Sequence, residues 1–143
     1  MLFDKHQQQV ILDHCWNIYD LITNTFHVDE DFHVEYISNI ESVLLTSRLY
    51  FKVTIEQGEY RLIIQEDYDF HFYELSIVNY SYILADKTAN TIIWSDPAPH
   101  HQTDYRGQNL ANFPNHLHDP KGRICNFSGR IEDFLKQVCK LIR

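Results

Sequence analysis

The chain of 143 residues has the length of one domain, and its nine Phe, nine Tyr and two Trp supply material for a hydrophobic core. This composition excludes a disordered chain, because disorder requires low hydrophobicity. The formal charge of −8 argues against general nucleic-acid binding, which depends on neutralising phosphates. The charge is uneven, because residues 1–96 are strongly acidic whereas residues 97–143 carry an excess of Lys and Arg. A local patch in the second segment could therefore still hold an anion.

Three features lead us to expect a cytoplasmic protein. No apolar run approaches the roughly 20 residues that cross a bilayer. The segment from Met1 to Gln9 lacks the basic and apolar regions of a signal peptide. The three cysteines, Cys15, Cys125 and Cys139, are odd in number and show no Cys-x-x-Cys spacing, so we expect neither a disulfide framework nor a cysteine zinc site.

The first predicted element is a helix over residues 5–24, for which Asp4 is a suitable N-cap. Its apolar residues recur at helical spacing and form one stripe, comprising Ile11, Cys15, Ile18 and Ile22. Trp16 and Tyr19 are expected to widen that stripe.

About five antiparallel strands are predicted in the centre of the chain, at residues 33–40, 49–55, 60–66, 72–85 and 91–95. The clearest is 49–55, where apolar side chains alternate with Tyr50, Lys52 and Thr54 in the pattern of a half-buried strand. Their connections are too short for parallel crossovers, which indicates an antiparallel meander.

The pattern changes after Asp96, because Pro97 and Pro99 cannot continue a central strand. Residues 97–122 hold all four prolines and show no periodicity, and a loop this long in a compact domain is usually functional or disordered. A C-terminal helix follows, with Ser128 as a candidate N-cap and an apolar stripe of Ile131, Leu135, Val138 and Ile142. We therefore predict a single α+β domain, residues 1–143, with both terminal helices packed on the sheet and the long loop covering one end.

The long loop concentrates histidine, since four of the nine histidines fall within it: His100, His101, His116 and His118. Histidine titrates near neutral pH and is the commonest metal ligand. Such a cluster can move protons, bind a metal ion or, when protonated, hold a phosphate. The alternative is a solvated polar loop without a function of its own.

Two segments of this region resemble the TumE-type toxins, small proteins encoded beside a helix-turn-helix antitoxin. They are Ile92-Ile93-Trp94-Ser95-Asp96-Pro97-Ala98-Pro99-His100-His101 and Phe113-Pro114-Asn115-His116-Leu117-His118. Weaker matches are Tyr80-Ser81-Tyr82 and a strand glutamate, Glu66, and the resemblance covers roughly residues 45–142. Asn115 stands where the family pattern has histidine, and the spacer of residues 102–112 is longer than usual.

The resemblance implies a toxin that acts on RNA or translation and pairs with a helix-turn-helix antitoxin. Our first hypothesis is a metal-independent endoribonuclease, because the 2′-OH of RNA can serve as the nucleophile while imidazoles act as base and acid. The candidate catalytic residues are Asp96, His100, His101, His116 and His118. Arg106, Lys121 and Arg123 are candidates for contacts with phosphate, and Tyr82 and Trp94 for stacking on bases.

Two alternatives remain open from the sequence. The same five residues, Asp96 and the four histidines, also form a plausible open shell for zinc or manganese, which would make the chain a metal-dependent hydrolase or nuclease. The second alternative is a binding module without catalysis, in which the acidic run from Glu66 to Asp69 contacts a basic partner such as an antitoxin tail.

Overall fold

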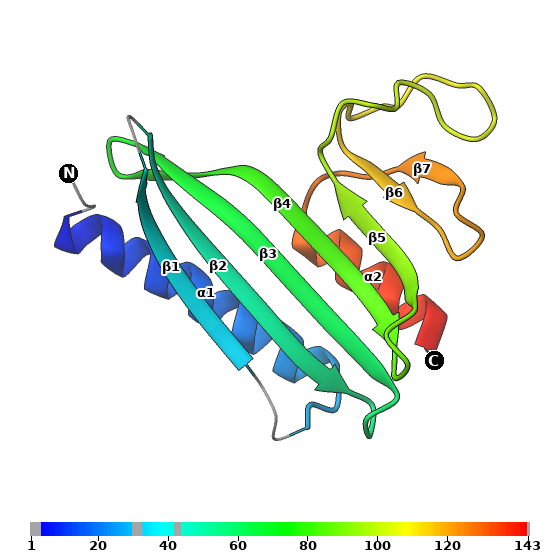
Figure 1. Cartoon of the computed structure of the whole chain (residues 1–143), viewed down its shortest axis with the longest axis horizontal. Coiled ribbons are helices and arrows are strands. Elements are labelled where there is room, and N and C mark those ends of the chain that lie inside the picture. Colours follow the sequence, from blue (N-terminus) through cyan, green and yellow to red (C-terminus); the bar gives the residue numbers. More distant parts are fainter. Residues whose placement is uncertain (1–3, 30–32, 42–43, 143) are drawn as a thin grey trace.

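The computed structural model describes residues 4–29, 33–41 and 44–142 and shows the predicted α+β class (Figure 1). The strands form one antiparallel sheet, in which they lie side by side in chain order. In the sequence, one helix precedes these strands and another follows them. The bounds are α1 Lys5–Thr25, β1 His33–Glu41, β2 Leu44–Ile55, β3 Tyr60–His71, β4 Glu74–Asp86, β5 Thr91–Asp96, β6 His116–His118, β7 Ile124–Asn126 and α2 Ile131–Ile142. The meander has seven strands rather than about five, because β6 forms within residues 97–122, which were predicted to be loop throughout, and β7 follows it. Neither helix is long and apolar enough to cross a membrane, within the residues described.

Helix α1 begins as predicted at Asp4, whose carboxylate accepts the backbone N–H of Gln7 in a capping box. Its predicted stripe packs on the sheet, with Ile11, Ile18 and Ile22 buried. The expectation that Trp16 and Tyr19 widen this stripe is wrong, since they are 61% and 36% exposed. At 3.6 residues per turn, position 16 lies about 140° around the helix from position 11, so Trp16 cannot share its face.

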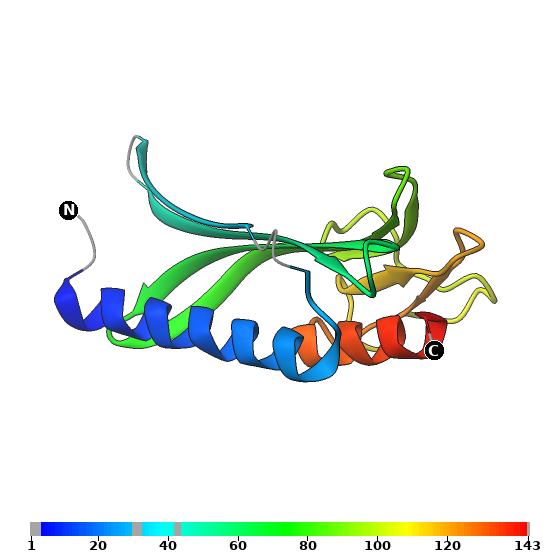
Figure 2. The same ribbon diagram turned by 90° about the horizontal axis from the view of Figure 1, so that it is seen from below.

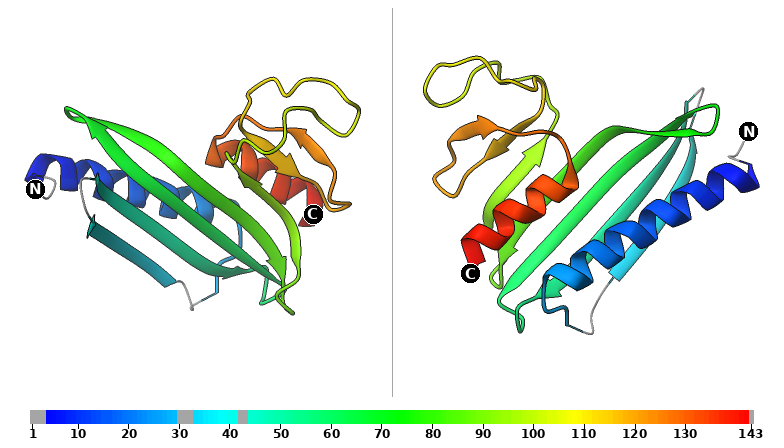
Figure 3. Two further views of the ribbon diagram at one scale, coloured as in Figure 1. Left: turned by 45° about the horizontal axis from the view of Figure 1, so that its top comes forward. Right: turned by 180° about the vertical axis from the view of Figure 1, so that it is seen from behind.

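Both helices lie on the same side of the sheet and leave the other face open (Figure 2). Figure 3 shows α1 running behind the first strands and α2 behind β4 and β5, and both helices contact β4. The core fills the space between the helices and the sheet, and its fully buried members include Ile18, Ile22, Phe51, Leu62, Ile64, Leu84 and Phe134. The C-terminal stripe is buried as predicted at Ile131, Leu135 and Val138. The prediction that Ser128 is the N-cap of α2 is wrong, because the helix begins three residues later at Ile131. The Ser128 hydroxyl accepts the N–H of Arg130.

One row of paired residues crosses five strands on the open face. It consists of Lys52, Ile63, Ile83, Trp94 and His118, each directly opposite the next. Residues that pair directly point to the same face of a sheet. Tyr82 and Leu84, on either side of Ile83 in β4, are fully buried on the face that the helices cover, so the row belongs to the other face.

A carboxylate network occupies the core at the centre of β3. Glu66 is fully buried and accepts hydrogen bonds from the hydroxyls of Tyr68 and Tyr82, while its Oε1 lies 2.7 Å from Nε2 of His14 in α1. Burial alone would raise the pKa of Glu66, but the hydrogen bond and charge of His14, with the two tyrosines, outweigh burial and lower that pKa. Of the acidic run predicted to contact a basic partner, Glu66 and Tyr68 are thus enclosed in the core, Asp67 pairs with Arg48 at 2.7 Å, and Asp69 is exposed.

Candidate functional site

Strand pairing brings the two histidine segments together at one end of the sheet. Strand β5 ends at Asp96, the loop of residues 97–115 leaves the sheet, and the chain returns as β6 beside β5 (Figure 1). The pairing places Asp96 opposite His116 and Trp94 opposite His118. The ligand atoms of four histidines then lie within 4.8 Å of one another, from His100, His101, His116 and His118. We refer to these four residues as the histidine cluster.

His116 is the most firmly held member of the cluster. Its side chain is fully buried, and its Nδ1 lies 3.0 Å from the carbonyl oxygen of Pro114. A carbonyl oxygen only accepts hydrogen bonds, so Nδ1 carries a proton and Nε2 is the nitrogen with which His116 can bind a metal ion. That Nε2 lies 3.1 Å from Nε2 of His118. The backbone of His116 is also fixed, because the buried hydroxyl of Ser95 donates to its carbonyl oxygen.

His118 lies between the other three histidines of the cluster and an aromatic ring. The indole of Trp94 stacks on its imidazole, with ring centroids 3.9 Å apart and planes inclined by 9°. Burial lowers the pKa of His118 to about 4, and neighbouring His116 contributes in the same direction. The pKa of His101 is also lowered, by loss of solvation and by the adjacent imidazoles. Both rings are therefore neutral near pH 7, which is the form in which histidine binds metal ions.

The Asp96 carboxylate makes two contacts, one with the backbone of the following turn and one with an imidazole of the cluster. Its Oδ1 accepts the backbone N–H of Ala98 at 2.9 Å and so caps the turn that leaves β5. The same oxygen lies 3.6 Å from Nε2 of His116. A negative charge thus borders the cluster where the imidazole lone pairs converge.

Two residues outside the predicted set position the segment that precedes β6. The hydroxyl of Tyr80 donates to Oδ1 of Asn115 at 2.7 Å, and burial raises the pKa of Tyr80 to about 12, so that it remains a donor. Asn115 also packs against Gly129, where an added Cβ would lie 2.9 Å from the Asn115 side chain. The sequence signals for these contacts were Tyr80 in its Tyr-x-Tyr segment and Asn115 in place of a histidine, but neither indicated that the two residues meet.

The prediction that Tyr82 stacks on bases is wrong. Tyr82 is fully buried, donates its hydroxyl to Glu66 and lies 5.6 Å from the ring of Phe134 in α2. A side chain enclosed between sheet and helix offers no face to a ligand. Trp94, the other predicted platform, is half-buried on the open face beside the cluster.

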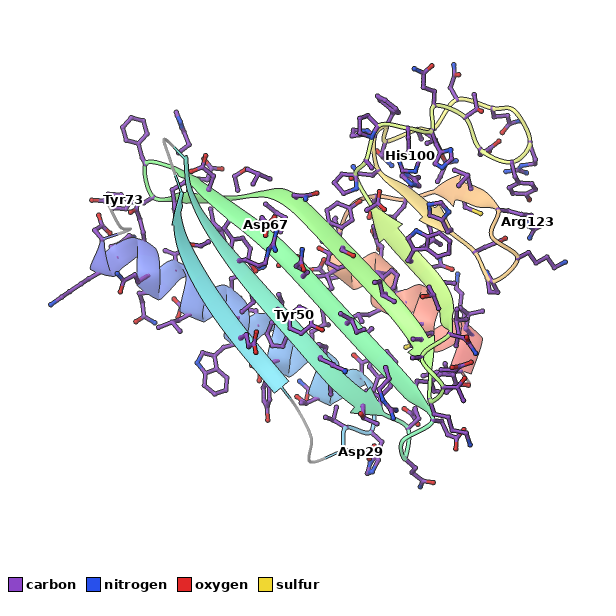
Figure 4. The ribbon with its side chains drawn as sticks, in the orientation of Figure 1. Asp29, Tyr50, Asp67, Tyr73, His100 and Arg123 are labelled. Carbon is purple, nitrogen blue, oxygen red and sulfur yellow. The ribbon has the colours of Figure 1, made fainter. Side chains whose placement is uncertain are left out.

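Two of the three residues predicted to contact phosphate, Arg106 and Arg123, lie around Tyr105. The guanidinium groups of Arg106 and Arg123 lie 5.3 and 4.5 Å from the Tyr105 ring centre. Arg106 is 3.8 Å from Asp104, and Arg123 is 2.7 Å from Asp119, so acidic partners compete for both. Figure 4 shows Arg123 extending away from His100, and Lys121 is exposed in the same β6–β7 turn.

Comparisons of the chain with protein-family models, curated proteins and solved structures found no match. The chain is thus described by its own fold and site, an α+β domain with four imidazoles gathered at one end of the open sheet face. The relation to TumE-type toxins remains an expectation from the two sequence segments.

Proposed function

We propose that the histidine cluster binds a divalent transition-metal ion and that the chain is a metal-dependent hydrolase. The observation that supports this most is the convergence of four ligand atoms within 4.8 Å, two of them 3.1 Å apart. Tetrahedral ligands with metal–nitrogen bonds of about 2.1 Å are separated by about 3.4 Å. The His116–His118 pair is already close to that spacing, and rotation of the exposed His100 and half-buried His101 can take up the remaining difference.

The same spacing favours a metal ion over paired imidazoles acting as acid and base. A general acid and a general base must reach different oxygens of the scissile phosphate, so the reacting group lies between them. Nitrogens 3.1 Å apart leave no room for it. The arginines predicted to contact phosphate lie around Tyr105, and a divalent ion in the cluster would supply positive charge to the transition state instead.

The surroundings of the cluster suit hydrolysis. A divalent ion held by these histidines would supply a water molecule of lowered pKa as the nucleophile. We assign Asp96 to accept the proton of that water, because its carboxylate is partly exposed and borders His116 at 3.6 Å. His100 is exposed and is the ligand that can most easily give way to substrate.

The biological role that we propose rests on the resemblance to TumE-type toxins. It is that of a toxin paired with a helix-turn-helix antitoxin, with RNA phosphodiesters as the substrate. The three cysteines are free, which suits the reducing cytoplasm that we expect as its location.

Cleavage of RNA by the purified protein tests this proposal. We expect cleavage that is lost in EDTA and restored by Zn²⁺ or Mn²⁺, and growth inhibition that is lost in His101→Ala and His118→Ala. His27→Ala is the matched control, since His27 is an exposed histidine outside the cluster. Undiminished cleavage in EDTA would favour the metal-independent mechanism, and toxicity of both cluster variants would show that the cluster is not the active centre.

A further inference from the structure

A basic hollow lies on the open face of the sheet, across strands β2, β3 and β4. Its volume is about 190 Å³, and Lys52, Arg61 and Lys87 line it over a floor that includes Ile63 and Ile83. Among the residues that the structure describes, none of those lining the hollow is acidic. These three cations are most of the five Lys and Arg in the otherwise acidic residues 1–96. The hollow therefore gathers positive charge within the acidic part of the chain.

The existing contacts of these cations leave them able to bind a ligand. Lys87 lies 3.6 Å from Glu59, but both side chains are more than half exposed, and such pairs contribute little. One terminal nitrogen of Arg61 donates to the carbonyl oxygen of Gly58, which leaves other donors of a guanidinium that has five. Lys52 is exposed on the open face, on the same side of β2 as Tyr50, because side chains two residues apart in a strand share a face.

The hollow is continuous with the histidine cluster through the paired row described above. From its floor the row passes from Ile63 to Ile83, then to Trp94 and to His118. At about 4.8 Å per strand, the three steps from Ile63 to His118 span about 14 Å. Cations thus stand at one end of an apolar and aromatic strip, and the proposed metal site stands at the other.

We propose that this strip binds single-stranded RNA across the strands and delivers one phosphodiester to the histidine cluster. Backbone phosphates lie on Lys52, Arg61 and Lys87, and bases lie on the isoleucines and on the exposed part of Trp94. Single strands suit this surface because unpaired bases can stack on an aromatic side chain, whereas bases in a duplex are enclosed. The inference rests on the proposed function, to which it adds the single-stranded form of the RNA and its path across the sheet.

Binding of a fluorescent oligouridylate to metal-free protein in EDTA tests the cationic end of the strip. We expect Lys52→Glu combined with Lys87→Glu to weaken binding by about tenfold or more at moderate salt, because two phosphate contacts become repulsive. The matched control is Lys136→Glu with Lys140→Glu, the same change of charge on exposed lysines of α2. That control should change affinity by less than about twofold.

Tryptophan fluorescence tests the aromatic part of the strip. The chain has two tryptophans, so Trp16→Phe leaves Trp94 as the single reporter. Oligouridylate should quench this variant as bases stack on Trp94. It should leave the emission of Trp94→Phe unchanged, because the remaining Trp16 lies on α1, which covers the opposite face of the sheet.

Equal affinity of the two charge-reversal variants, or quenching absent from the Trp16→Phe protein, would overturn the inference. So would polyglutamate of equal charge that competes as well as the oligouridylate, since the hollow would then be an ion-exchange surface without selection for RNA. Because binding is measured without metal, its outcome is separate from that of the hydrolase proposal. A protein that binds zinc but not oligouridylate would refute the RNA path alone.

Discussion

Replacing His116 with alanine should lower the affinity for Zn²⁺ by more than about 100-fold, because even partners that only orient a metal ligand contribute 10- to 100-fold. His116 is the centre of the cluster, with its Nε2 3.1 Å from Nε2 of His118 and 3.6 Å from Asp96. Pro114 fixes the ring so that this nitrogen presents its lone pair. Competition for Zn²⁺ with a chelating dye measures the loss.

Two controls separate loss of a ligand from loss of the fold. His27→Ala removes an exposed histidine elsewhere and should leave Zn²⁺ affinity unchanged. Because His116 is fully buried, thermal unfolding of metal-free protein accompanies the titration, and His118→Ala serves as a second variant if the first unfolds. A folded His116→Ala or His118→Ala protein with wild-type affinity would refute the metal site.

Replacing Glu66 with alanine should lower the free energy of unfolding by about 2–6 kcal/mol, because two buried hydroxyls lose their acceptor at about 1–3 kcal/mol each. Those hydroxyls belong to Tyr68 and Tyr82, and both tyrosines are fully buried. The contact of His14 with the sheet is lost as well. Urea denaturation of the metal-free protein measures the change.

The variant Glu66→Gln keeps the shape and an acceptor and should cost much less than Glu66→Ala. It also reports on pH. The pKa of Glu66 is lowered in the folded protein, so its charge contributes stability above the unfolded pKa of about 4.3, and that stability is lost as pH falls through the folded value. Glu66→Gln should therefore flatten the acid side of the stability profile. If Glu66→Ala lowers the free energy of unfolding by less than about 1 kcal/mol, the carboxylate network does not stabilise the fold.

Periodicity predicted the elements whose partners are near in the sequence. The spacing of Ile11, Ile18 and Ile22 placed α1 on the sheet, and the alternation over residues 49–55 placed Leu49, Phe51 and Val53 in the core. Strands β6 and β7 escaped prediction because three residues are too few to show a period. Strand β6 forms because the chain returns to pair with β5, and β7 then pairs with β6. No local sequence pattern predicts these pairings.

The candidate site was predictable as a set of residue types but not as a geometry. Histidines concentrated in a proline-rich loop indicated chemistry, and the gathering of four imidazoles is consistent with that indication. Which Lys and Arg side chains share a sheet row with these imidazoles depends on strand pairing across the sheet. Arg106 and Arg123, close in the sequence, lie around Tyr105, whereas distant Lys52 shares a row with His118.

X-ray absorption at the zinc edge, on protein loaded with one equivalent of Zn²⁺, tests the central claim most directly. Convergence of the four imidazoles predicts nitrogen ligands at about 2.0–2.1 Å with the outer-shell scattering of histidine, and the loss of one such ligand in His118→Ala. A spectrum of six oxygen ligands without imidazole scattering, unchanged in His118→Ala, would contradict a metal site at this end of the sheet.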